Sequence, residues 1–436
     1  MAIKVKFILH SASFFRIIFV KGGRFMSKAF NRADVLLPKG VDMTKWSVVA
    51  CDQYTSEPEY WKEVEKKVGD SVSTLKITLP EIYLEEDGVA ERIENINATM
   101  LDYINREIFT EYKKSYIYLE RTLADGTVRQ GIVGMVDLEE YDFSKGSQSL
   151  VRATEGTVLE RIPPRVRIRE NAALELPHVM LLIDDSQKSI IEPLAELNLR
   201  KVYDFELLQG GGHIKGYLVE NADELDEKLS MLADKAVFEE KYGVSGKGVL
   251  QYAVGDGNHS LATAKTCWEN LKAQGVKEHP ARFALAEIVN LHSDALNFEP
   301  IHRVLFDVDT KNFVELFTEY LCADRTPDKQ WAEVVVGDTR EKLYIHSAKS
   351  NLSVGSVQNF VDYYLERFGG RVDYIHGDEV VYSLAKGEGC VGILLGAMQK
   401  ADLFPTVILD GALPRKTFSM GHACDKRFYL ECRKIK

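Results

Sequence analysis

The six residues from Gly255 to Ser260 combine the residue types that bind phosphate. They follow the apolar run 249–254 and precede a stretch with helical spacing, so we expect a strand, a tight loop and a helix in that order. A helix start presents backbone N–H groups without intrahelical partners and a partial positive charge. Glycines beside it let a phosphate approach the backbone. The segment therefore predicts a phosphate-binding loop.

Each side chain of this loop has chemistry that suits a phosphate site. A carboxylate such as that of Asp256 holds divalent metal ions that bridge phosphate oxygens. The imidazole of His259 suits donation to a phosphate or proton transfer. The alternative is a plain turn and helix cap, because the loop consists of ordinary turn residues and matches neither the P-loop nor the G-x-G-x-x-G pattern. We expect the remaining phosphate contacts from Gly255, Gly257, Asn258 and Ser260.

Arginines are crowded into residues 152–169 of an otherwise acidic chain: Arg152, Arg161, Arg165, Arg167 and Arg169. The last three alternate, so a strand would place them on one face. On that interpretation Arg165 and Arg167 grip phosphates. The alternative is an exposed edge strand whose charges discourage aggregation.

Two further basic pairs are candidates for phosphate binding, His302-Arg303 and Arg415-Lys416. The second pair lies in a glycine-flanked tail that we expect to fold back over the site as a lid. For His302 the alternative is a partly buried histidine with its hydrogen bonds satisfied. For the second pair the alternative is a basic surface segment.

A phosphoryl transfer to a hydroxyl also needs a base or an orienting carboxylate near the acceptor. Asp52 and Glu57 lie in an early loop, after a short apolar run that we expect to be a strand. Thr55 or Ser56 is expected to cap the helix that follows. Both acids suit the acceptor role, and the residues alone do not decide between them. The alternative for Glu57 is a first-turn acid that complements the helix dipole.

Composition excludes several classes of protein. The chain has 436 residues, with 55 basic and 66 acidic side chains and a formal net charge of −11. With 45% hydrophobic residues it is too apolar for a disordered chain and too charged for a multispan membrane protein. The acidic balance argues against a nucleic-acid partner. Six cysteines without C-x-x-C spacing indicate reduced thiols, so we expect a cytoplasmic protein.

The first 25 residues differ from the rest, because they contain five bases and no acid. His10 and Arg16 interrupt their apolar run, which argues against a signal peptide and a membrane span. We expect residues 1–25 to be an extension upstream of Met26, and the alternative is a targeting or surface-binding segment. No transmembrane helix and no membrane partner are expected after Met26.

Helix and strand signals alternate to the end of the chain. Two strands are expected around Gly210–Gly212, and one capped helix over residues 221–242. The mixture predicts an α+β (mixed α/β) fold with mixed sheets, either as one body or as two lobes. Residues 26–436 are treated as a single region, with the phosphate-loop core around residues 245–305.

The loop GDGNHSLATA resembles the DGHHR-type loop of the domain-of-unknown-function family numbered one-zero-one-five. The segment VVACDQYTSEPEYW looks like that family's amino-terminal APPYDVIS-type loop. Phe298–Arg303 looks like its PTHR element, and Leu413–Phe418 like its carboxy-terminal MPPKST-type element. These motifs cover most of residues 26–436 in the family's order. Where many relatives have Arg after His, this chain has Ser260, so either another cation holds the phosphate or the site prefers a different ligand.

The family's loop is in turn similar to the phosphate-binding loop of the ParB/sulfiredoxin superfamily, which includes free serine kinases. The resemblance implies a ParB/sulfiredoxin-like core that binds ATP or ADP with Mg²⁺ through Asp256, Gly257, Asn258 and His259. It implies a phosphotransferase acting on a small hydroxylated metabolite, with free L-serine as the leading substrate. The alternatives are a nucleotide-binding switch or slow NTPase, and a non-nucleotide hydrolase or binding protein. The oligomeric state is not fixed by these residues.

Overall fold

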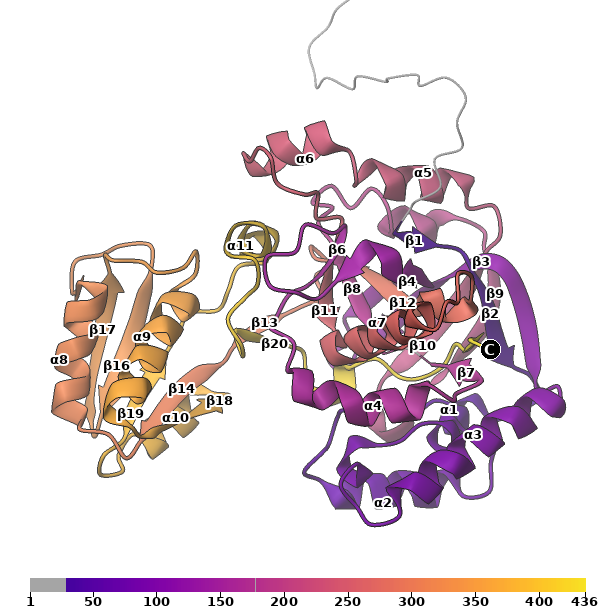
Figure 1. Cartoon of the computed structure of the whole chain (residues 1–436), viewed down its shortest axis with the longest axis horizontal. Coiled ribbons are helices and arrows are strands. Elements are labelled where there is room, and N and C mark those ends of the chain that lie inside the picture. Colours follow the sequence, from indigo (N-terminus) through magenta and orange to yellow (C-terminus); the bar gives the residue numbers. More distant parts are fainter. Residues whose placement is uncertain (1–28, 177) are drawn as a thin grey trace, which may run out of the picture.

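The computed structural model describes residues 29–176 and 178–436. Figure 1 shows a large lobe built around a broad sheet and a small lobe with a sheet of its own. Helices alternate with strands in both, which confirms the mixed α/β fold. The extension expected at residues 1–25 lies outside the described residues. In the part that is described, every helix is too short or too polar to cross a bilayer.

The sheet of the large lobe has eleven strands among the described residues and mixes parallel with antiparallel neighbours. Its order is β5-β6-β11-β8-β12-β4-β3-β10-β9, with β1 beside β4 and β2 beside β3. β11 runs parallel to β6 and antiparallel to β8. The strands are β1 Phe30–Asn31, β2 Ala33–Pro38, β3 Phe109–Thr122, β4 Val128–Asp137, β5 Tyr141–Asp142, β6 Val151–Ala153, β8 Met180–Ile183, β9 Arg200–Glu206, β10 His213–Val219, β11 Tyr252–Asp256 and β12 Phe283–Asn290.

Both faces of this sheet are covered, as the sequence of β3 shows. Its side chains alternate between two buried layers, with Tyr116 and Tyr118 in one and Ile117 and Leu119 in the other. Helices α5 and α7 contribute to the tyrosine layer, and α2 and α3 to the opposite layer. The helices of this lobe are α1 Met43–Trp46, α2 Pro58–Val68, α3 Val89–Asn105, α4 Ile162–Arg169, α5 Asp223–Met231, α6 Lys235–Tyr242 and α7 Asn258–Ala273.

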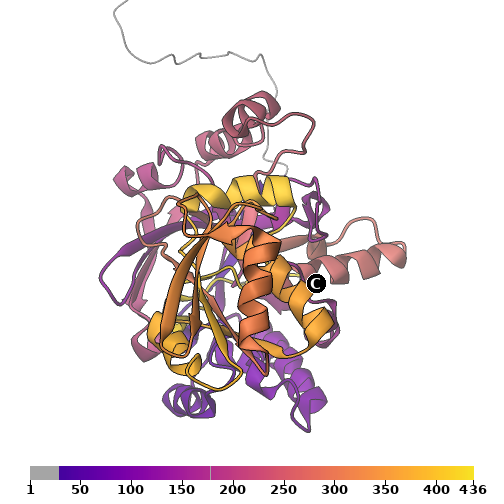
Figure 2. The same cartoon turned by 90° about the vertical axis from the view of Figure 1, so that its left-hand side faces the viewer.

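The small lobe is an antiparallel sheet in the order β15-β17-β16-β19-β14-β18. Val334 of β16 packs with α8 and α9, whereas its neighbour Val335 packs with α10 on the other face. Figure 2 turns this lobe toward the viewer and shows its helices against the sheet. The elements are β14 His302–Phe306, α8 Thr310–Leu321, β15 Ala323–Asp324, β16 Trp331–Val336, β17 Thr339–Ile345, α9 Ser353–Phe368, β18 Arg371–Ile375, α10 Asp378–Leu384 and β19 Val391–Leu394.

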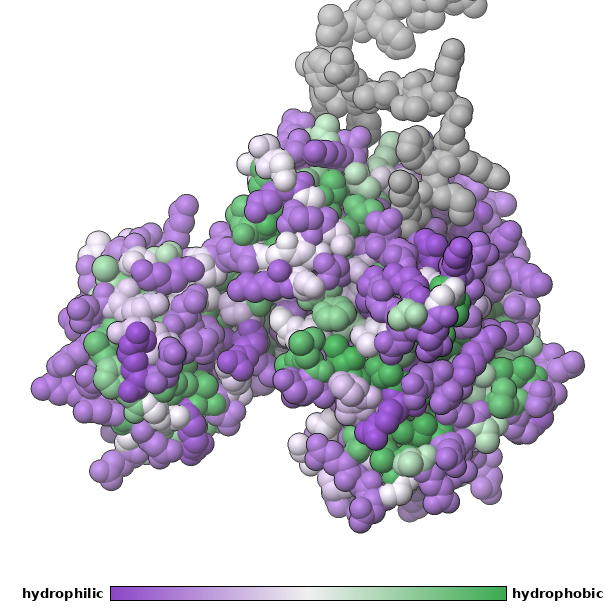
Figure 3. Space-filling model, viewed as in Figure 1, coloured by the Kyte–Doolittle hydropathy of each residue, from purple (hydrophilic) through white to green (hydrophobic). Residues whose placement is uncertain are grey.

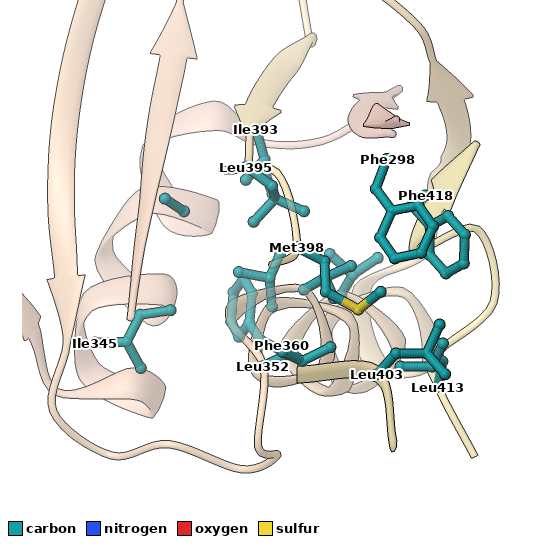
Figure 4. Packing of buried hydrophobic residues seen from close by; sticks show 14 of the residues in the cluster. Phe298, Ile345, Leu352, Phe360, Ile393, Leu395, Met398, Leu403, Leu413 and Phe418 are labelled. Carbon is teal, nitrogen blue, oxygen red and sulfur yellow. The ribbon is translucent and has the colours of Figure 1, made fainter. Parts of the chain in front are cut away.

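One apolar core continues from the small lobe into the large one. Figure 4 shows Phe360 and Ile393 of the small lobe near Met398, and Phe298 against Phe418 on the far side. The Phe298 and Phe418 ring centroids are 4.2 Å apart. They come from the pair β13 Phe298–Pro300 and β20 Phe418–Met420, next to α11 Leu403–Asp410. A second pair, β7 Leu174–Glu175 and β21 Arg433–Lys434, ties the carboxy-terminal segment to the large lobe.

Several local predictions are wrong. Residues 165–169 form helix α4 and not a strand, because Pro163 and Pro164 occupy its first turn. Residues 221–242 form two helices, since Asp234 caps the start of α6 with its side chain. Helix α2 is preceded by Glu57, which makes no cap hydrogen bond, and not by a capping Thr or Ser. The apolar run before Asp52 forms only an isolated bridge between Val49 and Phe428.

Candidate functional site

The junction of β11 and α7 has the strand–loop–helix order that its spacing predicts. β11 ends at Asp256 and α7 begins at Asn258. Gly257 between them has a left-handed φ of 80°, and a Cβ there would lie 3.0 Å from the Cα of Val179, so the position requires glycine. Within the described residues no side chain caps α7. Its first backbone N–H groups are therefore open to an anion.

Two buried polar atoms near this helix start have no hydrogen-bond partner among the described residues. They are the amide oxygen of Asn258 and the hydroxyl of Thr157. Thr157 adjoins Val158, whose N–H donates to Nε2 of His259 over 3.3 Å. A buried polar atom without a partner costs roughly 1–3 kcal/mol. These two atoms fit a ligand that carries hydroxyl donors together with phosphate acceptors.

Basic side chains reach the loop from the carboxy-terminal segment. Nζ of Lys426 lies 3.3 Å from Oδ2 of Asp256. Burial raises the pKa of Glu155, while Lys416 and Lys426 oppose that rise and Asp256 adds to it. The structure thus brings the unpredicted Lys426 into contact with Asp256, and it brings Lys416, one of the predicted phosphate ligands, within electrostatic range of Glu155.

Asp52 lies beside His178, whose ring faces Ser260 at the start of α7. Its Oδ2 is 3.5 Å from Nε2 of His178. Burial opposes ionisation of Asp52, but His178, Gln53 and Lys426 together hold the pKa of this carboxyl below its usual value. Asp52 is therefore ionised at neutral pH, within electrostatic reach of the cation that faces Asp256.

A row of hydrogen bonds runs from Ser260 into the core. Oγ of Ser260 lies 3.0 Å from Nε2 of His178, and Nδ1 of His178 lies 3.0 Å from the hydroxyl of Tyr429. That hydroxyl donates to Sγ of Cys51 over 2.9 Å. Burial, with Asp52 and Glu81, raises the pKa of the Cys51 thiol, which stays protonated. Cys51 is thus a protonated thiol at the end of this row.

His259, the predicted acid or base, is kept neutral. Burial, together with Arg165 and Arg161, lowers its pKa to about 4, although Asp52 opposes them. Because its Nε2 accepts from Val158, its proton lies on Nδ1. The neutral ring therefore has an N–H to donate to a ligand.

The crowded arginines are mostly engaged within the fold. Arg165 donates to Glu81 through Nε over 2.9 Å, and Arg169 pairs with Glu175 at 2.5 Å. The guanidinium of Arg152 is held by the backbone carbonyls of residues 149, 248 and 249, and burial lowers its pKa to about 10. Arg167 is exposed on α4. Arg165 still lies close enough to act on His259.

His302 and Arg303 lie in the small lobe and not at the loop. Nδ1 of His302 accepts from the N–H of Leu395 over 3.1 Å, and its Nε2 is 2.9 Å from Asp378. Arg303 donates to the carbonyls of Ile301 and Arg415 and to Gln358. Their hydrogen-bonding groups serve β14 and its neighbours, so the structure gives them a packing role.

The remaining predicted residues are placed separately. Glu57 is exposed at the start of α2. Gly255 is required by packing, because a Cβ there would lie 2.8 Å from Cγ of Leu182. Arg415 points toward the small lobe, 3.9 Å from Asp362. Of the predicted basic tail, only Lys416 is brought to the loop.

Sequence reasoning missed His178 and Lys426. His178 precedes Ser260 by 82 residues and Lys426 follows Asp256 by a longer stretch of chain, so no spacing links them. The one sequence feature that points to His178 is its position just before an apolar run, which forms β8 and pairs with β11.

Comparison with known proteins shows to which family this chain belongs. A family described as "Protein of unknown function (DUF1015)" matches residues 36–364. This chain belongs to that family. Among curated proteins no relative matches.

Solved structures with a related arrangement are distant. Free serine kinase in complex with AMP is 12% identical, with a TM-score of 0.37 over 69% of this chain and 91% of that chain. A conserved hypothetical protein from Pyrococcus furiosus is 10% identical, with a TM-score of 0.34 over 69% and 94%. Carboxy-terminally truncated SbnI from Staphylococcus aureus is 11% identical, with a TM-score of 0.34 over 66% and 82%. At these values the similarities assign no ligand or activity to this chain.

Proposed function

We propose that this protein is a nucleotide-dependent phosphotransferase whose acceptor is a small hydroxylated metabolite. The observation that carries the proposal is the start of α7, where uncapped N–H groups after Gly257 face ionisable groups of both signs. An anion bound there contacts the ammonium group of Lys426, and the ionised carboxylate of Asp52 lies nearby.

The phosphates of the nucleotide bind at the helix start. Backbone N–H groups of the first turn donate to phosphate oxygens, as at other uncapped helix starts. Nδ1 of the neutral His259 and the unpaired hydroxyl of Thr157 add donors. Lys426 supplies the positive charge that an arginine at position 260 would have supplied. Lys416 acts on the same carboxyl group, Glu155, as Lys426 does. This set replaces an arginine clamp with point charges from the carboxy-terminal segment.

Asp52 orients the hydroxyl that attacks the phosphoryl group. An ionised carboxylate accepts a hydrogen bond from the acceptor hydroxyl and takes its proton as the new P–O bond forms. The bond from that phosphorus to the bridging oxygen breaks at the same time, and the nucleotide leaves with one phosphate fewer. The low pKa of Asp52 keeps it in that form, and the side-chain amide of Gln53, which donates to Oδ1 over 2.9 Å, holds it in place. Positioning and charge supply most of the catalysis in phosphoryl transfer, and this pair supplies both.

We expect Mg²⁺ to bind at this site only together with the nucleotide. Among residues 29–176 and 178–436 no group of three His, Cys, Asp or Glu side chains is arranged to hold a metal ion. One or two carboxylates with substrate phosphates are a normal Mg²⁺ environment, and Asp256 with Glu155 offers that. Mg²⁺ held there neutralises phosphate charge when the nucleotide is bound.

The experiment is a transfer assay with purified full-length chain, ATP or ADP with Mg²⁺, and a panel of hydroxylated metabolites that includes L-serine. We expect nucleotide consumption that depends on one acceptor, with formation of its phosphate ester. Asp256→Asn and Asp52→Asn are expected to abolish the transfer. Consumption without any acceptor would favour a slow NTPase, and full activity in both variants would remove the assignment.

A further inference from the structure

A cavity of about 150 Å³ opens beside the first turn of α7. Its walls come from α4, α7 and the segment 77–84, and most of them are apolar, including Leu79, Met100, Ile168 and Ala264. In Figure 3 hydrophobic surface gathers in the lower part of the large lobe, between α4 and α2. An apolar cavity of about this volume holds a benzene-sized group. The charged side chains on its wall are paired with each other, so the cavity favours an uncharged group.

Ser260 and His178 form the polar end of this cavity. When Tyr429 donates its hydroxyl proton to Sγ of Cys51, its oxygen accepts a hydrogen bond from Nδ1 of His178, which then carries the ring proton. Nε2 then has a free lone pair 3.0 Å from Oγ of Ser260, which donates to it. This is the tautomer in which a histidine takes a proton from a serine hydroxyl.

The surroundings stabilise the charges that this proton transfer creates. Oδ2 of Asp52 lies 3.5 Å from Nε2 of His178 and faces the imidazolium once it has formed. The uncapped N–H groups at the start of α7 lie one turn or less from Ser260 and can donate to an oxyanion. The N–H groups at the helix start are independent of the hydrogen bond between Ser260 and His178.

We infer that Ser260 is a nucleophile activated by His178, and that this site cleaves esters whose acyl part is an uncharged, benzene-sized group. Oγ of Ser260 forms a bond to the acyl carbon while its proton moves to Nε2 of His178. The bond from the acyl carbon to the alcohol oxygen breaks, and the alcohol leaves with that proton. Water then attacks the acyl carbon while His178 takes one of its protons, the bond from the acyl carbon to Oγ breaks, and His178 returns the proton to Oγ as the acid leaves. This activity goes beyond phosphoryl transfer and needs no nucleotide.

The test uses phenylmethanesulfonyl fluoride, whose ring matches the cavity and whose sulfur forms a bond to an activated serine oxygen as fluoride leaves. The full chain is incubated with the reagent without nucleotide, and the modified peptide is identified by mass spectrometry. We expect modification at Ser260. His178→Gln is expected to slow it by at least about 100-fold, on the scale of lost base catalysis.

Two further variants separate the site from general reactivity. Ala264→Leu fills the cavity and is expected to slow modification by about tenfold, whereas Ala273→Leu, at an exposed position on the same helix, leaves the rate unchanged. Folding of each variant is checked by circular dichroism. Absence of the adduct in folded protein, or an equal rate in His178→Gln, would overturn the inference. Nucleotide binding is measured separately, so either proposal can fail without the other.

Discussion

The start of α7 in the large lobe and strand β14 in the small lobe hold similar residue types in very different states. At β14, His302 uses both ring nitrogens and Arg303 bonds two carbonyls and an amide. At α7, backbone N–H groups are uncapped and the polar atoms of Asn258 and Thr157 lack partners among the described residues. This difference shows that residue type alone does not identify a functional site, whereas hydrogen-bonding groups without partners do.

The largest contrast is expected between two aspartates that each face a histidine. Asp52→Asn should lower phosphoryl transfer by about 10²–10⁴-fold, because the acceptor hydroxyl loses its carboxylate. Asp378→Asn removes the exposed partner of His302 and should leave turnover unchanged. Steady-state rates of both variants test this. Equal losses would mean that the two pairs do not differ in role.

Arg303 should act on stability alone. Arg303→Met leaves the buried carbonyl of Ile301 and the partly buried carbonyl of Arg415 without their donor, which is expected to cost about 3 kcal/mol of unfolding free energy. Nucleotide affinity should not change. Urea denaturation and calorimetric titration of the same variant measure the two quantities. If folded Arg303→Met lost nucleotide affinity, the small lobe would have to be part of the nucleotide site.

The two buried histidines should respond differently to a ligand. Burial lowers the pKa of His259 to about 4 and also lowers the pKa of His302. Between the usual histidine pKa of 6.5 and these lower values the unfolded chain binds more protons, so stability is full above pH 6.5 and falls as the pH drops toward 4. A bound phosphate favours the protonated ring, so pyrophosphate should raise the pKa of His259 and leave that of His302 unchanged.

Proton NMR titration of the two imidazoles measures this response, with His259→Gln and His302→Gln used for assignment. An unchanged midpoint for His259 in saturating pyrophosphate would contradict a phosphate site at α7. A shift in His302 would contradict the contrast between the lobes.

Glu57 is expected to show the smallest effect. It is exposed at the start of α2 and makes no cap hydrogen bond, so Glu57→Gln should cost at most about 1 kcal/mol through the helix dipole. Turnover should stay within a few fold of the wild-type rate. A loss on the scale expected for Asp52→Asn would transfer the acceptor role to Glu57.

Local patterns predict the elements of this fold better than its site. The strand–loop–helix order around Gly257 follows from an apolar run, a glycine and helical spacing, and all three are local. The alternating arginines imitate a strand, although Pro163 and Pro164 already indicate a helix start. These side chains follow the period of a helix and not the two-residue period of a strand.

The partners of the loop depend on long-range packing. His178 meets Ser260 because β8 lies beside β11, and Lys426 arrives with the segment that leads to β21. Neither contact has a signature in the sequence. The sequence equally gives no sign that the hydrogen bonds of His302 and Arg303 are satisfied, because their partners come from the residue after β19, from α9 and α10 and from the tail.

The central claim is that α7 begins at a phosphate site completed by Lys426. Isothermal titration of the full chain with ADP and Mg²⁺ tests it most directly, alongside Lys426→Met and the control Lys342→Met, which alters a lysine over Trp331 in the small lobe. We expect binding in the wild-type chain, at least tenfold weaker binding in Lys426→Met, and wild-type affinity in the control. Equal affinity in all three, or no binding by folded wild-type chain, would contradict the claim.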